Sequence, residues 1–130
     1  MKKFTFNKIE RICHKKEIET LFYHNKSFLS YPLKVLYRYS DIQDDKNIKI
    51  LISVPKRNIK KAVNRNLLKR RIKEAFRQHK FILSNHLDST NKKMQIAFVY
   101  IGKEIVDYGV IENKIILTLQ RLTIDNEKTN

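Results

Sequence analysis

The sequence of 130 residues holds one cysteine, two glycines, two prolines and no tryptophan. A single cysteine, Cys13, excludes an internal disulfide and a metal site built from several thiolates. With only Gly102 and Gly109, the chain has no glycine-rich phosphate loop, which excludes a P-loop nucleotidase and a dinucleotide-binding domain. No apolar run approaches the roughly 18 residues needed to span a bilayer, and no signal-peptide pattern follows Met1. We therefore expect a cytoplasmic protein with no membrane partner.

Acidic residues are also scarce, with 13 Asp and Glu against 28 Lys and Arg, and they are dispersed along the chain. Side-chain or metal-assisted hydrolysis needs convergent carboxylates, or a serine or cysteine beside a base. The neighbouring Cys13 and His14 do not meet this need, because adjacent side chains diverge on a helix. The four histidines follow no established metal spacing. The sequence therefore predicts no catalytic residue and no metal bound by the protein itself.

Positive charge is what the chain has in excess, and the formal net charge is +15. Eleven Lys and Arg residues lie between Val54 and Lys80, accompanied by one acid, Glu74. Such a density of cations is typical of a protein that binds the phosphates of RNA or DNA, although a cationic helix flank can also be a solvated face. A DNA-reading module is the weakest alternative, because no helix-turn-helix pattern is visible.

Hydrophobic periodicity predicts helices at residues 14–23, 62–80 and 107–122 and strands at 28–39, 48–54 and 94–101. We expect the first two strands to form a hairpin and residues 84–93 to be a polar connection. The order predicts one monomeric α+β domain over residues 1–130, in which helices cover a sheet. Residues 1–8 and 125–130 are expected to be flexible.

Two alternations assign faces to these elements. In the strand 28–39, Leu33, Val35, Tyr37 and Tyr39 share one side, and Lys34, Leu36 and Arg38 share the other. In the helix 62–80, the apolar stripe is Leu68, Ile72, Ala75, Phe76 and His79, and a basic stripe is Arg65, Lys69, Lys73 and Arg77. The two stripes are neighbours on the helix, since successive residues are about 100° apart. We expect the helix to lie on the sheet and to present a cationic flank.

Three sequence patterns are specific. Residues 62–77 carry A-V-x-R-N-x-x-K-R-x-x-x-E-A-F-R, residues 4–12 carry F-x-F-x-K-x-E-R-I, and residues 53–56 read S-V-P-K. Together they resemble the bacterial ribonuclease P protein subunit, the small basic partner of the catalytic RNA that removes 5′ leaders from precursor tRNA. The resemblance implies an αβββαβα sandwich with a mixed sheet and a left-handed βαβ crossover, similar to ribosomal proteins. The sequence differs from the usual family pattern at Leu67, where a basic residue is usual, and at Ile18, where phenylalanine is frequent.

The resemblance also implies two binding surfaces. Contacts with the RNA subunit would come from Lys56, Lys61, Arg65, Asn66, Lys69, Arg70, Lys73 and Arg77. A cleft for the leader would be lined by Ile18, Phe22, Tyr37 and Phe6, of which Phe6 could instead anchor the N-terminal segment. The expected partners are ribonuclease P RNA, with its Mg²⁺ ions, and the 5′ leader of precursor tRNA. A ribosomal or other structural RNA-binding protein with no role in cleavage remains the alternative.

Overall fold

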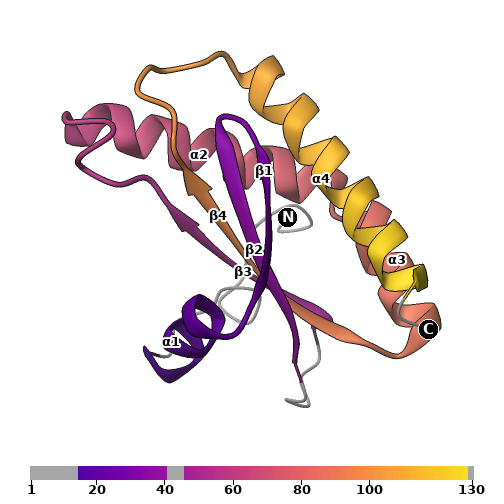
Figure 1. The fold of residues 1–130 in the computed structure, drawn as a ribbon. Helices are drawn as coiled ribbons and strands as arrows, with labels where there is room; N and C mark the ends of the chain where they lie inside the picture. The colour runs from indigo at the N-terminus through magenta and orange to yellow at the C-terminus, as the bar shows by residue number, and fades with distance from the viewer. Residues whose placement is uncertain (1–14, 41–45, 129–130) are drawn as a thin grey trace.

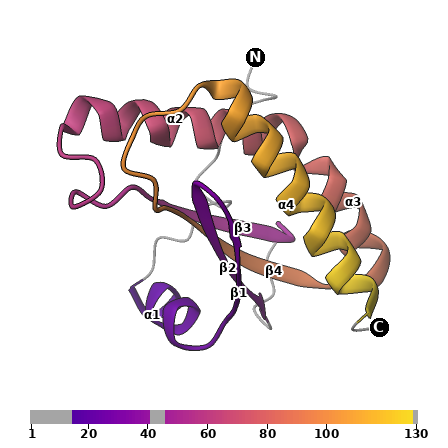
Figure 2. The ribbon, with the colours of Figure 1, turned by 45° about the horizontal axis from the view of Figure 1, so that its top comes forward.

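A four-stranded sheet lies between α1 on one face and three helices on the other (Figure 1, Figure 2). The computed structural model describes residues 15–40 and 46–128. The elements are α1 (Lys15–Tyr23), β1 (Lys26–Ser30), β2 (Leu33–Ser40), β3 (Ile48–Ser53), α2 (Ala62–His79), α3 (Phe81–Thr90), β4 (Lys93–Tyr100) and α4 (Tyr108–Lys128). The predicted α+β class is confirmed, and the observed order differs from αβββαβα only by the added α3.

The strand order is β1-β2-β4-β3, with β4 antiparallel to β2 and parallel to β3. The predicted hairpin between β2 and β3 is therefore wrong, because β4 lies between them. Strand β4 is buried along nearly its whole length, and its sequence is apolar without a break from Ile96 to Tyr100, as is typical of an inner strand that is covered on both faces. The parallel neighbours β3 and β4 are connected through α2 and α3.

The predicted long strand at residues 28–39 is instead a hairpin of β1 and β2. A turn with a cis peptide bond between Tyr31 and Pro32 separates the two strands. Their register pairs Phe28 with Val35 and brings the tip of the hairpin near the end of β4. There the Ile101 amide donates a hydrogen bond to the Pro32 carbonyl at 2.8 Å.

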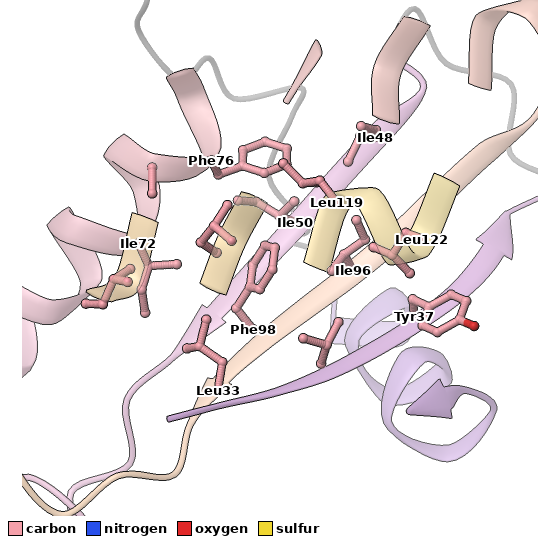
Figure 3. Close-up of a cluster of buried hydrophobic side chains, with 14 of the residues drawn as sticks. Leu33, Tyr37, Ile48, Ile50, Ile72, Phe76, Ile96, Phe98, Leu119 and Leu122 are labelled. Atoms are coloured by element: carbon pink, nitrogen blue, oxygen red, sulfur yellow. The ribbon is translucent and has the colours of Figure 1, made fainter. Parts of the chain in front are cut away.

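The main core lies between the sheet and the pair α2 and α4 (Figure 3). It is built from alternate residues of the strands and from the apolar stripes of both helices. Its fully or almost fully buried members include Leu33, Ile48, Ile50, Ile96, Phe98, Leu68, Ile72, Phe76, Leu119 and Leu122. Burial of each such side chain contributes about 1.5–3 kcal/mol to folding. A second, smaller cluster lies under α1 and contains Leu21, Leu36 and Ala97.

Residues 84–93, predicted as a connection, mostly belong to α3. Leu83 and Leu87 lie one helical turn apart and are both fully buried. Asn91 ends the helix in a left-handed conformation with φ of 54°, a conformation that asparagine tolerates better than most residues. Only Leu87 lies within residues 84–93, so the polar composition of this segment concealed its pairing with Leu83.

The C-terminal helix extends beyond its predicted end at residue 122. It continues to Lys128 because its last turns bind the sheet. The Tyr37 hydroxyl donates to Asp125 at 2.5 Å, and the Tyr39 hydroxyl donates to Asn126 at 2.9 Å. Residues 125–128, predicted to be a flexible tail, are thus part of the folded helix.

Candidate RNA-binding surfaces

Helix α2 presents the predicted RNA contacts on a rigid support. Its buried residues are Leu68, Ile72, Ala75 and Phe76. The predicted contacts divide by exposure: Lys56, Lys61, Asn66, Arg70 and Lys73 are exposed, and Arg65, Lys69 and Arg77 are half-buried. Asn66, Arg70 and Lys73 follow one another along the solvent side of the helix. An amide, a guanidinium and an ammonium group thus project from one rod that is packed against the core.

Two arginines of α2 bind backbone carbonyls of the fold. Arg65 Nη1 donates to the carbonyls of Ile59 at 3.1 Å and Lys60 at 2.6 Å, and so fixes the segment that leads into the helix. Arg71 Nη1 donates to the Val106 carbonyl at 2.5 Å and fastens the segment that leads into α4. From the sequence, Arg65 was expected only to contact the RNA subunit. No sequence pattern indicated any of these three carbonyls as a partner.

Arg77 forms an ion pair with Glu74 one turn earlier on α2. Arg77 Nε donates to Glu74 Oε1 at 2.9 Å, and Gln78 Nε2 donates to Glu74 Oε2 at 2.6 Å. Hydrogen bonds from Arg77 and Gln78 lower the pKa of Glu74, so the carboxylate stays charged. The positive charge at position 77 is therefore balanced within the helix, unlike that at Arg70.

The α1 face of the sheet forms the second candidate surface. Helix α1 places Leu21 on Leu36 and Ala97, and Ile18 packs against the same cluster. Two residues along the strands from Leu36 and Ala97, the same sheet face carries a row formed by Leu29, Lys34, Val99 and Ser53. Leu29 and Lys34 are exposed, and Val99 and Ser53 are half-buried. This row combines apolar surface with a cation beside α1, whose Phe22 is 42% exposed.

Two polar contacts connect α1 to the sheet, both through Glu17, and a hydrogen bond within the sheet supports them. Gln95 Nε2 donates to Glu17 Oε2 at 3.0 Å, and Arg38 Nη1 donates to Gln95 Oε1 at 3.4 Å. Lys49 Nζ lies 3.6 Å from Glu17 Oε2. Because Glu17 and Gln95 are far apart in the sequence, no local pattern indicated this contact.

The placement of Tyr37 in a cleft beside α1 is wrong. Its side chain lies on the core face with Leu33 and Val35, is 4% exposed, and packs edge-on against Phe28 at 6.0 Å between ring centroids. Burial and then the hydrogen bond to Asp125 raise its pKa above the ordinary tyrosine value. In Figure 3 Tyr37 stands beside the core cluster on the opposite side of its strand from α1. The residues of β2 that face α1 are Lys34, Leu36 and Arg38, as the alternation along the strand indicated.

The remaining predicted cleft residue, Phe6, lies outside the described residues. Across residues 15–40 and 46–128, no three His, Cys, Asp or Glu side chains gather as a metal site would require. In the same part of the chain, every helix is too short or too polar to cross a membrane.

Comparison with known proteins identifies the family. The ribonuclease P family model matches residues 6–108. The chain is 34% identical to the ribonuclease P protein component of Porphyromonas gingivalis over 119 residues, which cover 92% of this chain and 87% of the relative. It is 37% identical to that of Chlorobium phaeobacteroides over 93 residues, which cover 65% of this chain and 64% of the relative.

Solved structures share the fold. The RNase P protein of Staphylococcus aureus superposes with a TM-score of 0.70 at 21% identity, covering 88% of this chain and 96% of that one. The RNase P protein of Thermotoga maritima gives a TM-score of 0.69 at 26% identity, with 86% and 96% covered. With the match across residues 6–108, these similarities show that the chain belongs to the family of bacterial ribonuclease P protein components.

Proposed function

We propose that this chain binds ribonuclease P RNA through the exposed side of α2 and holds the 5′ leader of precursor tRNA on the α1 face of the sheet. Members of its family serve in tRNA 5′ processing as ribonuclease P subunits. The observation that carries the proposal is the exposed line of Asn66, Arg70 and Lys73 on a helix braced by buried side chains.

The chemistry of this line suits a folded RNA backbone. The Arg70 guanidinium can bind phosphate oxygens in a bidentate fashion, and the Lys73 ammonium acts as a compact charge. Asn66 can bind a sugar or phosphate oxygen without adding charge. A-form RNA hides its base edges in a deep, narrow groove, so a protein with these groups recognises backbone and shape. Lys56, Lys61 and Lys69 extend the cationic surface around the line.

The α1 face suits a single strand. Phe22 offers an exposed aromatic edge for a leader base, and stacking on an aromatic ring contributes about 1–3 kcal/mol per base. Lys34 and Arg38 are positioned on the same sheet face to bind leader phosphates. Ile18 supports this surface from below, since it packs into the cluster under α1.

The protein is an accessory subunit in this proposal, and it contributes no catalytic side chain. Hydrolysis of the phosphodiester bond belongs to the RNA and its Mg²⁺ ions. The high positive charge of the protein screens repulsion between the two RNA molecules and so lowers the Mg²⁺ concentration that they require.

Reconstitution tests the proposal. We expect the chain to let a bacterial ribonuclease P RNA process precursor tRNA at a low Mg²⁺ concentration, and to cleave nothing without that RNA. Failure to support processing, or cleavage by the chain alone, would refute it.

A matched pair of variants on α2 tests the binding surface. Arg70→Ala should weaken RNA-subunit binding and lower the log-log salt slope by about 0.7–0.9, as expected for one lost phosphate contact. Arg77→Ala serves as the control, because Glu74 already balances this charge. Equal effects of the two variants on the slope would contradict the assignment.

A further inference from the structure

The tip of the β1–β2 hairpin, the segment 101–107 and the segment 55–61 meet in a corner beside the start of α2. Two hollows open there. One, of about 340 Å³, is lined by Tyr31, Gly102 and Lys103 among others. The other, of about 460 Å³, is lined by Lys60, Lys61 and Lys103 among others. Lys103 lines both, so the two hollows adjoin, and we call them together the hairpin corner.

Hydrogen bonds hold the walls of the hairpin corner in place. Asn58 Nδ2 donates to the Tyr100 carbonyl at 3.0 Å, and Lys103 Nζ donates to Asn58 Oδ1 at 2.8 Å. The Tyr100 hydroxyl donates to the Glu104 carbonyl. These bonds connect the segments before α2 and after β4, so the hairpin corner is part of the rigid fold.

Gly102 allows the hairpin tip to approach closely. A Cβ atom at this position would lie 3.1 Å from both Pro32 Cβ and the Tyr100 ring, tighter than ordinary van der Waals contact. The side chain next to Pro32 is that of Tyr31, which is 59% exposed although the turn beneath it is fixed. The fold therefore presents an aromatic ring at the rim of a hollow that also holds Lys103.

The charges of the hairpin corner indicate the ligand. Lys60, Lys61 and Lys103 are all exposed, and Glu104 is the one acid among the residues that line the two hollows. Tyr31 shares its hollow with Lys103, and the adjoining hollow adds Lys60 and Lys61. Proteins bind single-stranded nucleic acid with a base stacked on an aromatic ring and the phosphates along a cationic groove. A purely apolar protein partner would leave these lysines without counter-charges.

We infer that the hairpin corner binds one unpaired nucleotide of an RNA strand, with its base against Tyr31 and an adjacent phosphate at Lys103 and Lys61. The inference rests on the proposed function in that the ligand is RNA, but it adds a site that α2 does not contain. The strand is either the ribonuclease P RNA or the leader of precursor tRNA, since both supply the same chemistry.

Substitutions of the ring test the site. Tyr31→Ala should weaken RNA binding about 5- to 140-fold, the range expected for loss of one base stack. Tyr31→Phe should retain the affinity, because stacking needs the ring and not the hydroxyl. Phe81→Ala is the matched control, since Phe81 is 57% exposed at the start of α3, far from the hairpin corner. Equal thermal midpoints would show that all three variants fold.

The salt dependence separates base from phosphate. Lys103→Gln should lower the log-log salt slope by about 0.7–0.9, whereas Tyr31→Ala should leave the slope unchanged. A loss of affinity for the isolated RNA subunit would assign the nucleotide to that RNA. A loss seen only with leader-bearing precursor, and not with mature tRNA, would assign it to the leader.

Two outcomes are kept distinct by including Arg70→Ala in the same series. If Arg70→Ala weakens RNA binding while Tyr31→Ala behaves like Phe81→Ala with both RNAs, the hairpin corner is not a nucleotide site. If Arg70→Ala also has no effect, the proposed role of α2 itself fails.

Discussion

The two faces of the sheet are made by the same four strands but meet different surroundings. On the core face, three tyrosine hydroxyls all donate to acceptors of the fold: Tyr37 to Asp125, Tyr39 to Asn126, and Tyr100 to the Glu104 carbonyl. On the α1 face, the strand register places four cations, Lys34, Arg38, Lys49 and Lys93. The core face thus packs against helices, whereas the α1 face carries positive charge that suits binding of a polyanion. Successive residues of one strand should therefore differ, with those on the core face contributing to stability and those on the α1 face contributing to RNA binding.

The largest expected effect is on the core face. Phe98 is fully buried and lies 6.1 Å from Phe76 between ring centroids, so Phe98→Ala should lower the free energy of unfolding by about 3–5 kcal/mol. The adjacent Val99 is half-buried on the α1 face, and Val99→Ala should cost less than about 1.5 kcal/mol. Urea denaturation measures both values. Similar losses would contradict the difference between the faces.

Tyr37→Phe should give the next largest effect, a loss of about 1.5–3 kcal/mol, because the hydroxyl binds a carboxylate. The pKa of Tyr37 is raised in the folded state, so its stabilising contribution is fully present below about pH 10 and is lost as pH rises further. Denaturation should be measured at pH 9 and again above pH 10. The free energy of unfolding should fall less over this rise in pH for Tyr37→Phe than for the wild type. The control is Tyr23→Phe, at a residue that is 82% exposed.

The same substitution tests the corrected position of this residue. Tyr37→Phe should leave the affinity for leader-bearing precursor tRNA unchanged relative to mature tRNA, because the ring is buried away from α1. A selective loss with the leader-bearing substrate would contradict the placement.

Local sequence patterns predicted where helices and strands lie better than they predicted which strands pair with one another. The spacing of Leu68, Ile72 and Phe76 gave α2 with its last residue misplaced by one, and alternation gave the faces of β2. Alternation does not say which strand lies alongside, so the position of β4 between β2 and β3 was missed. The apolar run from Ile96 to Tyr100 in β4 was the available signal, since a strand covered on both faces needs no alternation.

The sequence predicted a cationic flank on α2 as a group of residues, whereas it did not predict the contacts that single residues make. The charge run between residues 54 and 80 predicted an RNA-binding helix, but it could not show that Arg65 binds carbonyls just before the helix or that Arg71 binds the distant Val106 carbonyl. Tyr37 was misplaced for a similar reason. The alternation placed it with Leu33 and Val35, but the sequence did not say which face α1 covers.

A smaller effect is expected on the α1 face, where a charge can be removed without disturbing the core. Lys34→Gln should weaken binding of leader-bearing precursor by about fivefold, equivalent to about 1 kcal/mol, and lower the salt slope by about 0.7 for one phosphate of a single strand. Lys26→Gln is a suitable control. Lys26 is exposed on the same hairpin, but the register pairs it with Tyr37 and so assigns it to the other face of the sheet. Equal losses with both variants would indicate a general effect of charge.

The smallest effect should come from the polar contact that connects α1 to the sheet. Glu17→Gln keeps the shape of the side chain and removes its attraction to Lys49, which lies 3.6 Å away. Within the described residues Glu17 Oε1 is buried and has no hydrogen-bond partner, so removing the charge also removes a cost of desolvation. The two terms oppose each other, and we expect the free energy of unfolding to change by less than about 1 kcal/mol. A loss of unfolding free energy as large as that of Tyr37→Phe would contradict this expectation. It would mean that the polar contact of Glu17 holds α1 as firmly as the tyrosine hydroxyls hold α4, so that the two faces of the sheet would not differ in their polar contacts.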